Sequence, residues 1–311
     1  MSHERELGLG VQTDKPPGTY ARLAQAAEDG GFDVVTTFND LWFQPALPAL
    51  LEIAQATKRV RVGPSCLNPF MLHPVEIAGQ IAMLDAASDG RTFLGLARGA
   101  WLESLGIDQS EPVTAIREAW EIVGRLLAGD VSAFAGERFS LPQGSRLRYE
   151  RRRPSVPLLV GTWSPKLAAF AGTAAREMKI GGSANPDVVP VMRERIGNDD
   201  VRIVLGAVTV VDEDGDRARS IARREVAMYL GVVAQLDPTR SLDPDLLSAD
   251  AQIPDDVLDR FAFAGTPAQV AEHAEAVFDA GAGRIDFGTP HGVPEERGVE
   301  LLCTQVVPRL R

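Results

Sequence analysis

The chain has 311 residues, of which 45% are hydrophobic and 24% charged, which is enough apolar material for a large core. For a single domain, this size favours an α/β barrel, and two domains are the alternative. The 32 basic and 43 acidic residues give a net charge of −11, which argues against a nucleic-acid-binding surface because phosphate neutralisation requires basic residues in excess.

We expect a soluble, cytoplasmic protein with no membrane partner, since no apolar run of about 18 residues occurs and the first residues, MSHERELG, are charged. Cys66 and Cys303 lie far apart in the sequence and predict reduced thiols.

Eight stretches have strand character and alternate with helical patterns. They cover residues 7–11, 32–37, 60–63, 91–97, 156–161, 177–182, 201–211 and 283–288. Three helix starts are predicted where a capping residue precedes proline, at Ser164-Pro165, Asn185-Pro186 and Thr266-Pro267. This alternation predicts a single parallel (β/α)8 barrel over residues 1–311, with its reactive face at the carboxyl ends of the strands.

An open, doubly wound sheet is the alternative fold. Against it, the first turn, Gly8-Leu9-Gly10-Val11-Gln12-Thr13, lacks the third glycine of the dinucleotide-binding fingerprint. Two segments interrupt the alternation: residues 129–154 predict an inserted hairpin, and residues 235–259, rich in Asp and Pro, predict a second excursion. The basic run RLRYERRRP, residues 146–154, is either a solvated loop or a site for an anionic ligand tail or an acidic partner.

Several familiar sequence motifs are absent, which argues against the chemistries they support. The sequence contains no HExxH or CxxC motif, no phosphate loop of the GxxxxGK[ST] type and no GxSxG elbow, so a dedicated metal site, an NTP site and a serine nucleophile are not expected. An organic cofactor could instead supply the chemistry. Small residues end four strands, at 95–99, 161–165, 181–186 and 288–292, and the second and third of these turns expose helix-opening amides suited to a phosphate. Ordinary tight turns are the structural alternative.

The block VRVGPSCLNPFMLHPVEIAGQIAMLDAASDGRTFLGLARG, with VPLLVG, GGSANP, FAGTPAQV and IDFGTP after it, resembles the luciferase-like flavin and deazaflavin oxidoreductases over nearly the whole chain. It is most similar to the methylenetetrahydromethanopterin reductase type, which uses coenzyme F420. The resemblance implies a bulge after the third strand that backs the cofactor ring, with a non-proline cis peptide at Ser65–Cys66. It also implies a homodimer and a small-molecule substrate.

The resemblance assigns cofactor contacts to ten residues at the strand ends: Ser65, Cys66, Asn68, Arg98, Gly99, Gly161, Thr162, Ser183, Asn185 and Thr289. Among these, Ser65 and Cys66 face the ring, and Gly161, Thr162 and Ser183 hold the phosphate. Many relatives carry Asp-His or Glu after the second strand, where this chain has Asn39 and Asp40. These two are the candidate catalytic residues. Because an amide does not titrate near pH 7, proton transfer would belong to Asp40, to His291 or to solvent.

Three functions follow from this pattern. The first is a coenzyme F420-dependent oxidoreductase that transfers a hydride between the deazaflavin and a small organic substrate. The second is an FMN-dependent luciferase-like monooxygenase. The third is a cofactor-binding homologue without catalysis, suggested by the absence of the usual acid after the second strand. No metal is expected in any of them.

Overall fold

The computed structural model describes residues 4–239 and 253–311. In these residues, eight parallel strands follow the order β3-β2-β1-β11-β9-β8-β7-β4. Their bounds are β1 (Glu6–Val11), β2 (Val34–Thr37), β3 (Arg61–Pro64), β4 (Leu94–Ala97), β7 (Leu158–Gly161), β8 (Glu177–Gly181), β9 (Arg202–Val211) and β11 (Arg284–His291). Parallel bridges at Val62–Thr92 and Leu67–Leu96 join the two end strands. The predicted barrel is therefore confirmed, and the open sheet is excluded.

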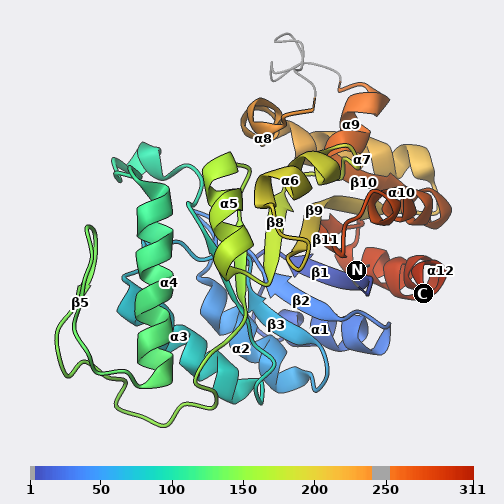
Figure 1. Cartoon of the computed structure of the whole chain (residues 1–311). Coiled ribbons are helices and arrows are strands. Elements are labelled where there is room, and N and C mark those ends of the chain that lie inside the picture. Colours follow the sequence, from blue (N-terminus) through green and yellow to red (C-terminus); the bar gives the residue numbers. More distant parts are fainter. Residues whose placement is uncertain (1–3, 240–252) are drawn as a thin grey trace.

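Helices surround these strands (Figure 1). The main ones are α1 (Thr19–Asp29), α2 (Ala46–Ala56), α3 (Pro74–Ala87), α4 (Pro112–Ala128), α5 (Pro165–Ala174), α6 (Val188–Ile196), α7 (Gly215–Ala227) and α10 (Pro267–Asp279). Shorter helices are α8 (Leu230–Leu236), α9 (Asp255–Phe261), α11 (Glu295–Leu301) and α12 (Val307–Leu310). Outward-facing strand residues such as Leu7, Leu9 and Ile285 are buried against the helices. Across the described ranges, no helix has both the length and the hydropathy of a membrane span.

Charged side chains fill the amino end of the barrel. The first residue of each of five strands is charged: Glu6, Arg61, Glu177, Arg202 and Arg284. Glu177 pairs with Arg284 at 2.7 Å and with Arg61 at 2.8 Å. Although burial opposes ionisation, these arginines lower the pKa of Glu177 to about 2. The layer closes the amino end of the barrel and leaves the carboxyl end for chemistry.

The most specific part of the resemblance, Leu84 to Gly95, has a structural role. Arg91 donates hydrogen bonds to the carbonyl oxygens of Ala54 and Thr57, both at 2.9 Å. Arg153, the last arginine of the basic run, donates to Asp85 Oδ1 from Nη2 at 2.5 Å. These contacts tie α3 and the excursion to the loops at the amino ends of the strands, so this part of the motif stabilises the fold. Its last residue, Gly95, lies beside the segment that follows β3.

The excursion at 129–154 contains the predicted hairpin, made of β5 (Phe134–Ala135) and β6 (Ser140–Leu141), which lies beyond α4 at the left of Figure 1. Glu118 of α4 accepts hydrogen bonds from three consecutive hairpin amides, at 137, 138 and 139. Strand β10 (Ala262–Gly265) pairs with β9 and was not predicted. Of the second predicted excursion, residues 240–252 lie outside the described residues.

Two of the three predicted helix starts are correct. Thr266 caps α10 with a full capping box, and Pro165 opens α5 after Ser164. The prediction at Asn185-Pro186 is wrong, because α6 begins at Val188. Asn185 Oδ1 accepts a hydrogen bond from the Asp187 amide at 3.0 Å, and this local turn delays the helix.

Candidate functional site

A bulge follows β3 and connects the neighbouring strands at the carboxyl end of the barrel. The Ser65 amide donates to Thr37 O at 2.8 Å, and the Leu67 amide donates to Gly95 O at 2.9 Å, so the segment bridges β2 and β4. The peptide between Ser65 and Cys66 is cis, which confirms the geometry that the resemblance implied. The backbone of the bulge therefore forms one wall of the barrel mouth.

The Cys66 side chain points into the barrel, between two strand-end glycines. A Cβ at position 161 would lie 2.8 Å from Cys66 Sγ, and one at position 95 would lie 3.2 Å from it. Burial raises the pKa of the Cys66 thiol to about 11, so the thiol is neutral near pH 7. The bulge and the Cys66 thiol approach Gly95 and Gly161 so closely that a side chain at either position would collide with them. These contacts within the protein explain the two glycines directly, whereas the sequence had suggested that a ligand approaches them.

A buried ion pair lies beneath this mouth. Lys179 Nζ is 2.7 Å from Asp286 Oδ2, and both side chains are almost fully buried. The same ammonium lies 5.4 Å from the centroid of the Phe38 ring. Although burial opposes ionisation, Arg284 and Lys179 lower the pKa of Asp286, so its carboxyl group is ionised. The pair was missed in the sequence, but its signal is present: charges alternate with apolar residues along β8 and β11, and in a barrel covered by helices such residues face inward.

The Asp40 carboxyl lies after β2, in the corner formed with β1. Gln12 Nε2 donates to Asp40 Oδ2 at 3.2 Å. Burial raises the pKa of Asp40, while the Gln12 hydrogen bond and the charge of Lys179 oppose that rise. Asn39 differs from its neighbour: its Oδ1 accepts from the Ala46 amide at 3.2 Å and anchors the start of α2. Of the two predicted catalytic residues, Asp40 is thus the one that can exchange a proton.

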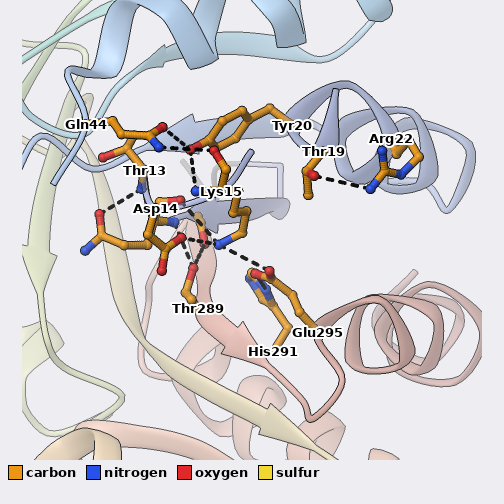
Figure 2. A network of polar contacts seen from close by, with 12 residues as sticks. Thr13, Asp14, Lys15, Thr19, Tyr20, Arg22, Gln44, Thr289, His291 and Glu295 are labelled. Atoms are coloured by element: carbon orange, nitrogen blue, oxygen red, sulfur yellow. Dashed lines mark hydrogen bonds and ion pairs between the residues drawn. The ribbon is translucent and has the colours of Figure 1, made fainter. Parts of the chain in front are cut away.

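A network of polar contacts supports this corner from β11 and α11 (Figure 2). Thr289 Oγ1 accepts from the Gln12 amide at 2.9 Å and lies 3.3 Å from Gly10 O, so it links β1 to β11. His291 is fully buried, with Nδ1 3.1 Å from Glu295 Oε1 and Nε2 3.1 Å from Phe287 O. Because both ring nitrogens are engaged inside the protein, His291 is poorly placed for the proton-transfer role considered from sequence.

The loops after β3 and β4 carry the next predicted contacts. Asn68 Oδ1 accepts hydrogen bonds from the amides of residues 70 and 71, and Gly99 has a φ of +82° beside the Asn68 amide. Gln109 fixes the loop by donating to the carbonyl oxygens of Arg98 and Gly99 at 2.6 and 3.1 Å. The Arg98 side chain is exposed and forms no ion pair with any described residue. Within the described part of the chain, Arg98 is therefore an unpaired basic residue at this strand end.

The loops after β7 and β8 are shaped by their own side chains. Thr162 Oγ1 accepts from the Ser164 amide, and Ser183 Oγ accepts from the Asn185 amide. Asn185 Nδ2 donates to Thr239 Oγ1 at 2.9 Å. At α5, Ser164 makes no capping hydrogen bond with its side chain, and Pro165 has no N–H. The amides of the first turn of α5 therefore face the loop after β7, an arrangement that suits a phosphate.

Two features lie apart from these strand ends. A surface cavity of about 560 Å³, lined by His73, Leu141, Arg146 and Arg148 among others, contains none of the predicted site residues. Among the residues that the structure describes, no three of His, Cys, Asp and Glu group in a way that could hold a metal ion.

The fold and these strand ends define a class: a (β/α)8-barrel protein with a bulged third strand and a site built at the carboxyl face. Residues 2–284 match the family described as Luciferase-like monooxygenase, and the chain belongs to that family.

Two curated relatives are similar over nearly full length. The 5,10-methylenetetrahydromethanopterin reductase of Archaeoglobus fulgidus is 28% identical over 94% of this chain and 95% of its own. The F420-dependent glucose-6-phosphate dehydrogenase of Amycolatopsis mediterranei is 24% identical over 95% of each chain. The solved structure of the coenzyme F420-dependent tetrahydromethanopterin reductase of Methanopyrus kandleri has a TM-score of 0.86 and 24% identity, covering 99% of this chain and all of that one. This last likeness supports the fold.

Proposed function

We propose that this protein is a coenzyme F420-dependent oxidoreductase that transfers a hydride between the deazaflavin ring and a small organic substrate. The observation that carries the proposal is the barrel mouth. There, the Ser65–Cys66 bulge lies against Gly161 on one side, and Asp40 lies at the end of the neighbouring strand β2. Near-full-length similarity to relatives that are named for F420 dependence supports the same cofactor.

The residues at the mouth fit this group. The bulge presents backbone and the neutral thiol of Cys66 to a flat ring, and Thr36 Oγ1 is buried without a hydrogen-bond partner among the described residues. Arg98 and the uncapped start of α5 supply positive potential for the anionic tail and phosphate. We assign Ser65, Cys66, Asn68 and Gly99 to the ring side. We assign Arg98, Gly161, Thr162 and Ser183 to the phosphate side. Asn185 and Thr289 support the neighbouring strand ends through the hydrogen bonds described above.

When bound, F420 supplies a ring carbon that gives or accepts the hydride. The protein orients the ring and excludes water, and Asp40 holds or releases the proton that accompanies the hydride. Burial raises the pKa of Asp40 toward the working range of a general acid. Asn39 contributes by holding the start of α2 and thereby the loop that carries Asp40.

The two alternatives make different demands. An FMN-dependent monooxygenase, which the family description includes, must react with oxygen at the same mouth. A non-catalytic homologue was suggested by the missing acid after the second strand. The position of Asp40, partly buried and hydrogen-bonded to Gln12, supplies a carboxyl group there and favours an enzyme.

Homodimerisation and a cytoplasmic location are further proposals, which rest on the family resemblance and on the sequence. Sedimentation velocity of the purified protein tests the first. A mass near 33.5 kDa, that of one chain, would contradict it.

Turnover tests the proposed function. Reduced F420 is mixed with the protein under anaerobic conditions and offered hydride acceptors, beginning with methylenetetrahydropterins, while oxidised F420 is offered glucose 6-phosphate and secondary alcohols. Absorbance of the oxidised deazaflavin reports transfer in either direction. Substrate-dependent transfer without oxygen is the expected result. Oxygen consumption with reduced FMN, without any hydride transfer to or from F420, would instead establish the monooxygenase.

A further inference from the structure

Gln12 is the polar side chain that contacts the Asp40 carboxyl from the neighbouring strand, and its orientation is set by the protein. Its Oε1 accepts a hydrogen bond from the Thr13 amide at 2.9 Å. Since the oxygen is occupied by a backbone donor, the NH₂ group is directed away from it, and it donates to Asp40 Oδ2 at 3.2 Å. The side chain of Gln12 is thus a donor dedicated to this carboxyl group.

The backbone that carries Gln12 is also held in place. Its amide donates to Thr289 Oγ1 on β11, and its carbonyl oxygen accepts from Lys15 Nζ at 3.3 Å. Lys15 is buried and pairs with Glu295 Oε2 at 3.2 Å, and Glu295 in turn contacts His291. Figure 2 shows Lys15, His291 and Glu295 converging beside Thr289. The loop after β1 is therefore anchored to α11 through buried charges.

A second anchor fixes the loop from the side of α1 and α2. The Tyr20 hydroxyl accepts from the Lys15 amide and donates to Gln44 Oε1, both at 2.9 Å. Gln44 Nε2 donates to Lys15 O at 3.2 Å. These bonds hold the loop without touching Asp40, so they allow loop anchoring to be separated from the Gln12 donor.

We propose that Gln12 is a positioning residue that holds the Asp40 carboxyl at the barrel mouth and stabilises its ionised form through its amide N–H. Only the expected effect of Gln12 on the rate of hydride transfer rests on the proposed function. A hydrogen bond to a charged acceptor is stronger than one to a neutral acceptor, so the ionised carboxylate gains more from Gln12 than the protonated acid does.

Among the described residues, the charged groups on the elements around Asp40 are paired with groups of opposite charge. On β8, Lys179 favours the ionised carboxylate, and its charge is opposed by Asp286 of β11 at 2.7 Å. Beyond Gln12, Lys15 is balanced by Asp14 at 2.7 Å and by Glu295, and the fully buried His291 is turned toward Glu295 and Phe287 O. Gln12 is therefore the neutral group whose replacement changes Asp40 most directly.

Carbon-detected NMR of the cofactor-free protein labelled with ¹³C-aspartate provides the test, with the Asp40 signal identified by its loss in Asp40→Asn. Gln12→Glu keeps an oxygen that accepts from Thr13 but replaces the donor by a negative charge. It should raise the proton affinity of Asp40 at least tenfold, since an opposing charge and a lost donor both favour the protonated acid. Gln12→Met, of similar shape, should raise it by about tenfold.

Two controls separate the donor from general effects. Gln44→Leu removes an anchor of the same loop, and Gln25→Leu makes the same change at an exposed glutamine of α1. Both variants should leave the proton affinity of Asp40, measured from its titration midpoint, within twofold of the wild-type value. An unchanged midpoint in folded Gln12→Glu and Gln12→Met, or an equal shift in Gln44→Leu, would overturn the proposal.

The second readout is the pH profile of hydride transfer, in which the Asp40 limb should move to higher pH in Gln12→Met. Because the NMR titration contains no cofactor, it distinguishes the two ideas: a shifted midpoint in a protein that does not bind F420 would refute the proposed function and leave the role of Gln12 intact.

Discussion

The strand-end glycines provide a graded test of the barrel mouth. A Cβ added at Gly95 would lie 2.2 Å from Pro64 O, a backbone atom at the end of β3 that cannot move independently. One added at Gly161 would lie 2.8 Å from Cys66 Sγ, which is 0.6 Å inside the ordinary contact limit of 3.4 Å, and one at Gly181 meets no atom within 4 Å. Overpacking a well-filled core costs about 1–3 kcal/mol. We therefore expect Gly161→Ala to cost an amount in this range, Gly95→Ala to cost more, and Gly181→Ala to change stability by less than about 0.5 kcal/mol.

Urea unfolding of the cofactor-free variants measures this order. The Gly161→Ala cost should fall by about 1 kcal/mol or more when combined with Cys66→Ala, because residues in contact do not behave additively. In that double variant the atoms nearest to the new Cβ are those of Ala97 at 3.3 Å and Cys66 Cβ at 3.9 Å. Equal costs at all three glycines, or strict additivity of Gly161→Ala with Cys66→Ala, would refute the inference that the thiol fills the space above Gly161.

Three further predictions address the site and its support. Asp40→Asn should lower the rate of hydride transfer by about 10²-fold or more while leaving the F420 dissociation constant within threefold, and an unchanged rate in single-turnover absorbance measurements would remove Asp40 from the mechanism. Arg98→Met should weaken F420 binding by about tenfold in a fluorescence titration, whereas Arg148→Met, at an exposed arginine of the excursion, should not; the opposite result would assign the anionic tail to the basic run. The pKa of Glu177 is held at about 2, below its ordinary value of 4.5, so its contribution to stability is complete above about pH 5 and is lost as the pH falls toward 2. Glu177→Gln should cost about 3–5 kcal/mol near neutral pH, because buried arginines lose their partner, and should flatten the acid side of the stability profile measured by urea unfolding.

The barrel was predictable because its signals are local. Each strand is a short β-branched or apolar run bounded by turn residues, and the helices between them carry regular apolar spacing. Strand β10 was missed because Ala262–Gly265 offers only small residues and one Phe, and its pairing with β9 is a long-range event. The helix start at 185–186 was misplaced because Asn185 bonds to its own loop and not to a helix amide.

The strand ends that carry the candidate site were predictable from sequence, and the contacts of their side chains were less so. The strand ends named from sequence do meet at one face of the barrel. The contacts of Asp40 and His291 could not be read from spacing, because Gln12, Lys179 and Glu295 come from strands and a helix far apart in the chain. Burial distinguishes the two proton-transfer candidates: His291 is enclosed with both nitrogens engaged, whereas Asp40 is only partly buried.

The measurement that tests the central claim most directly is a fluorescence titration of the purified, cofactor-free protein with coenzyme F420 and, separately, with FMN. The account predicts saturable binding of F420 that is markedly tighter than binding of FMN. It also predicts that Arg98→Met binds F420 more weakly than the wild-type protein does. Preference for FMN would contradict it and favour the monooxygenase, and binding of neither would show that the barrel mouth does not serve as a deazaflavin site.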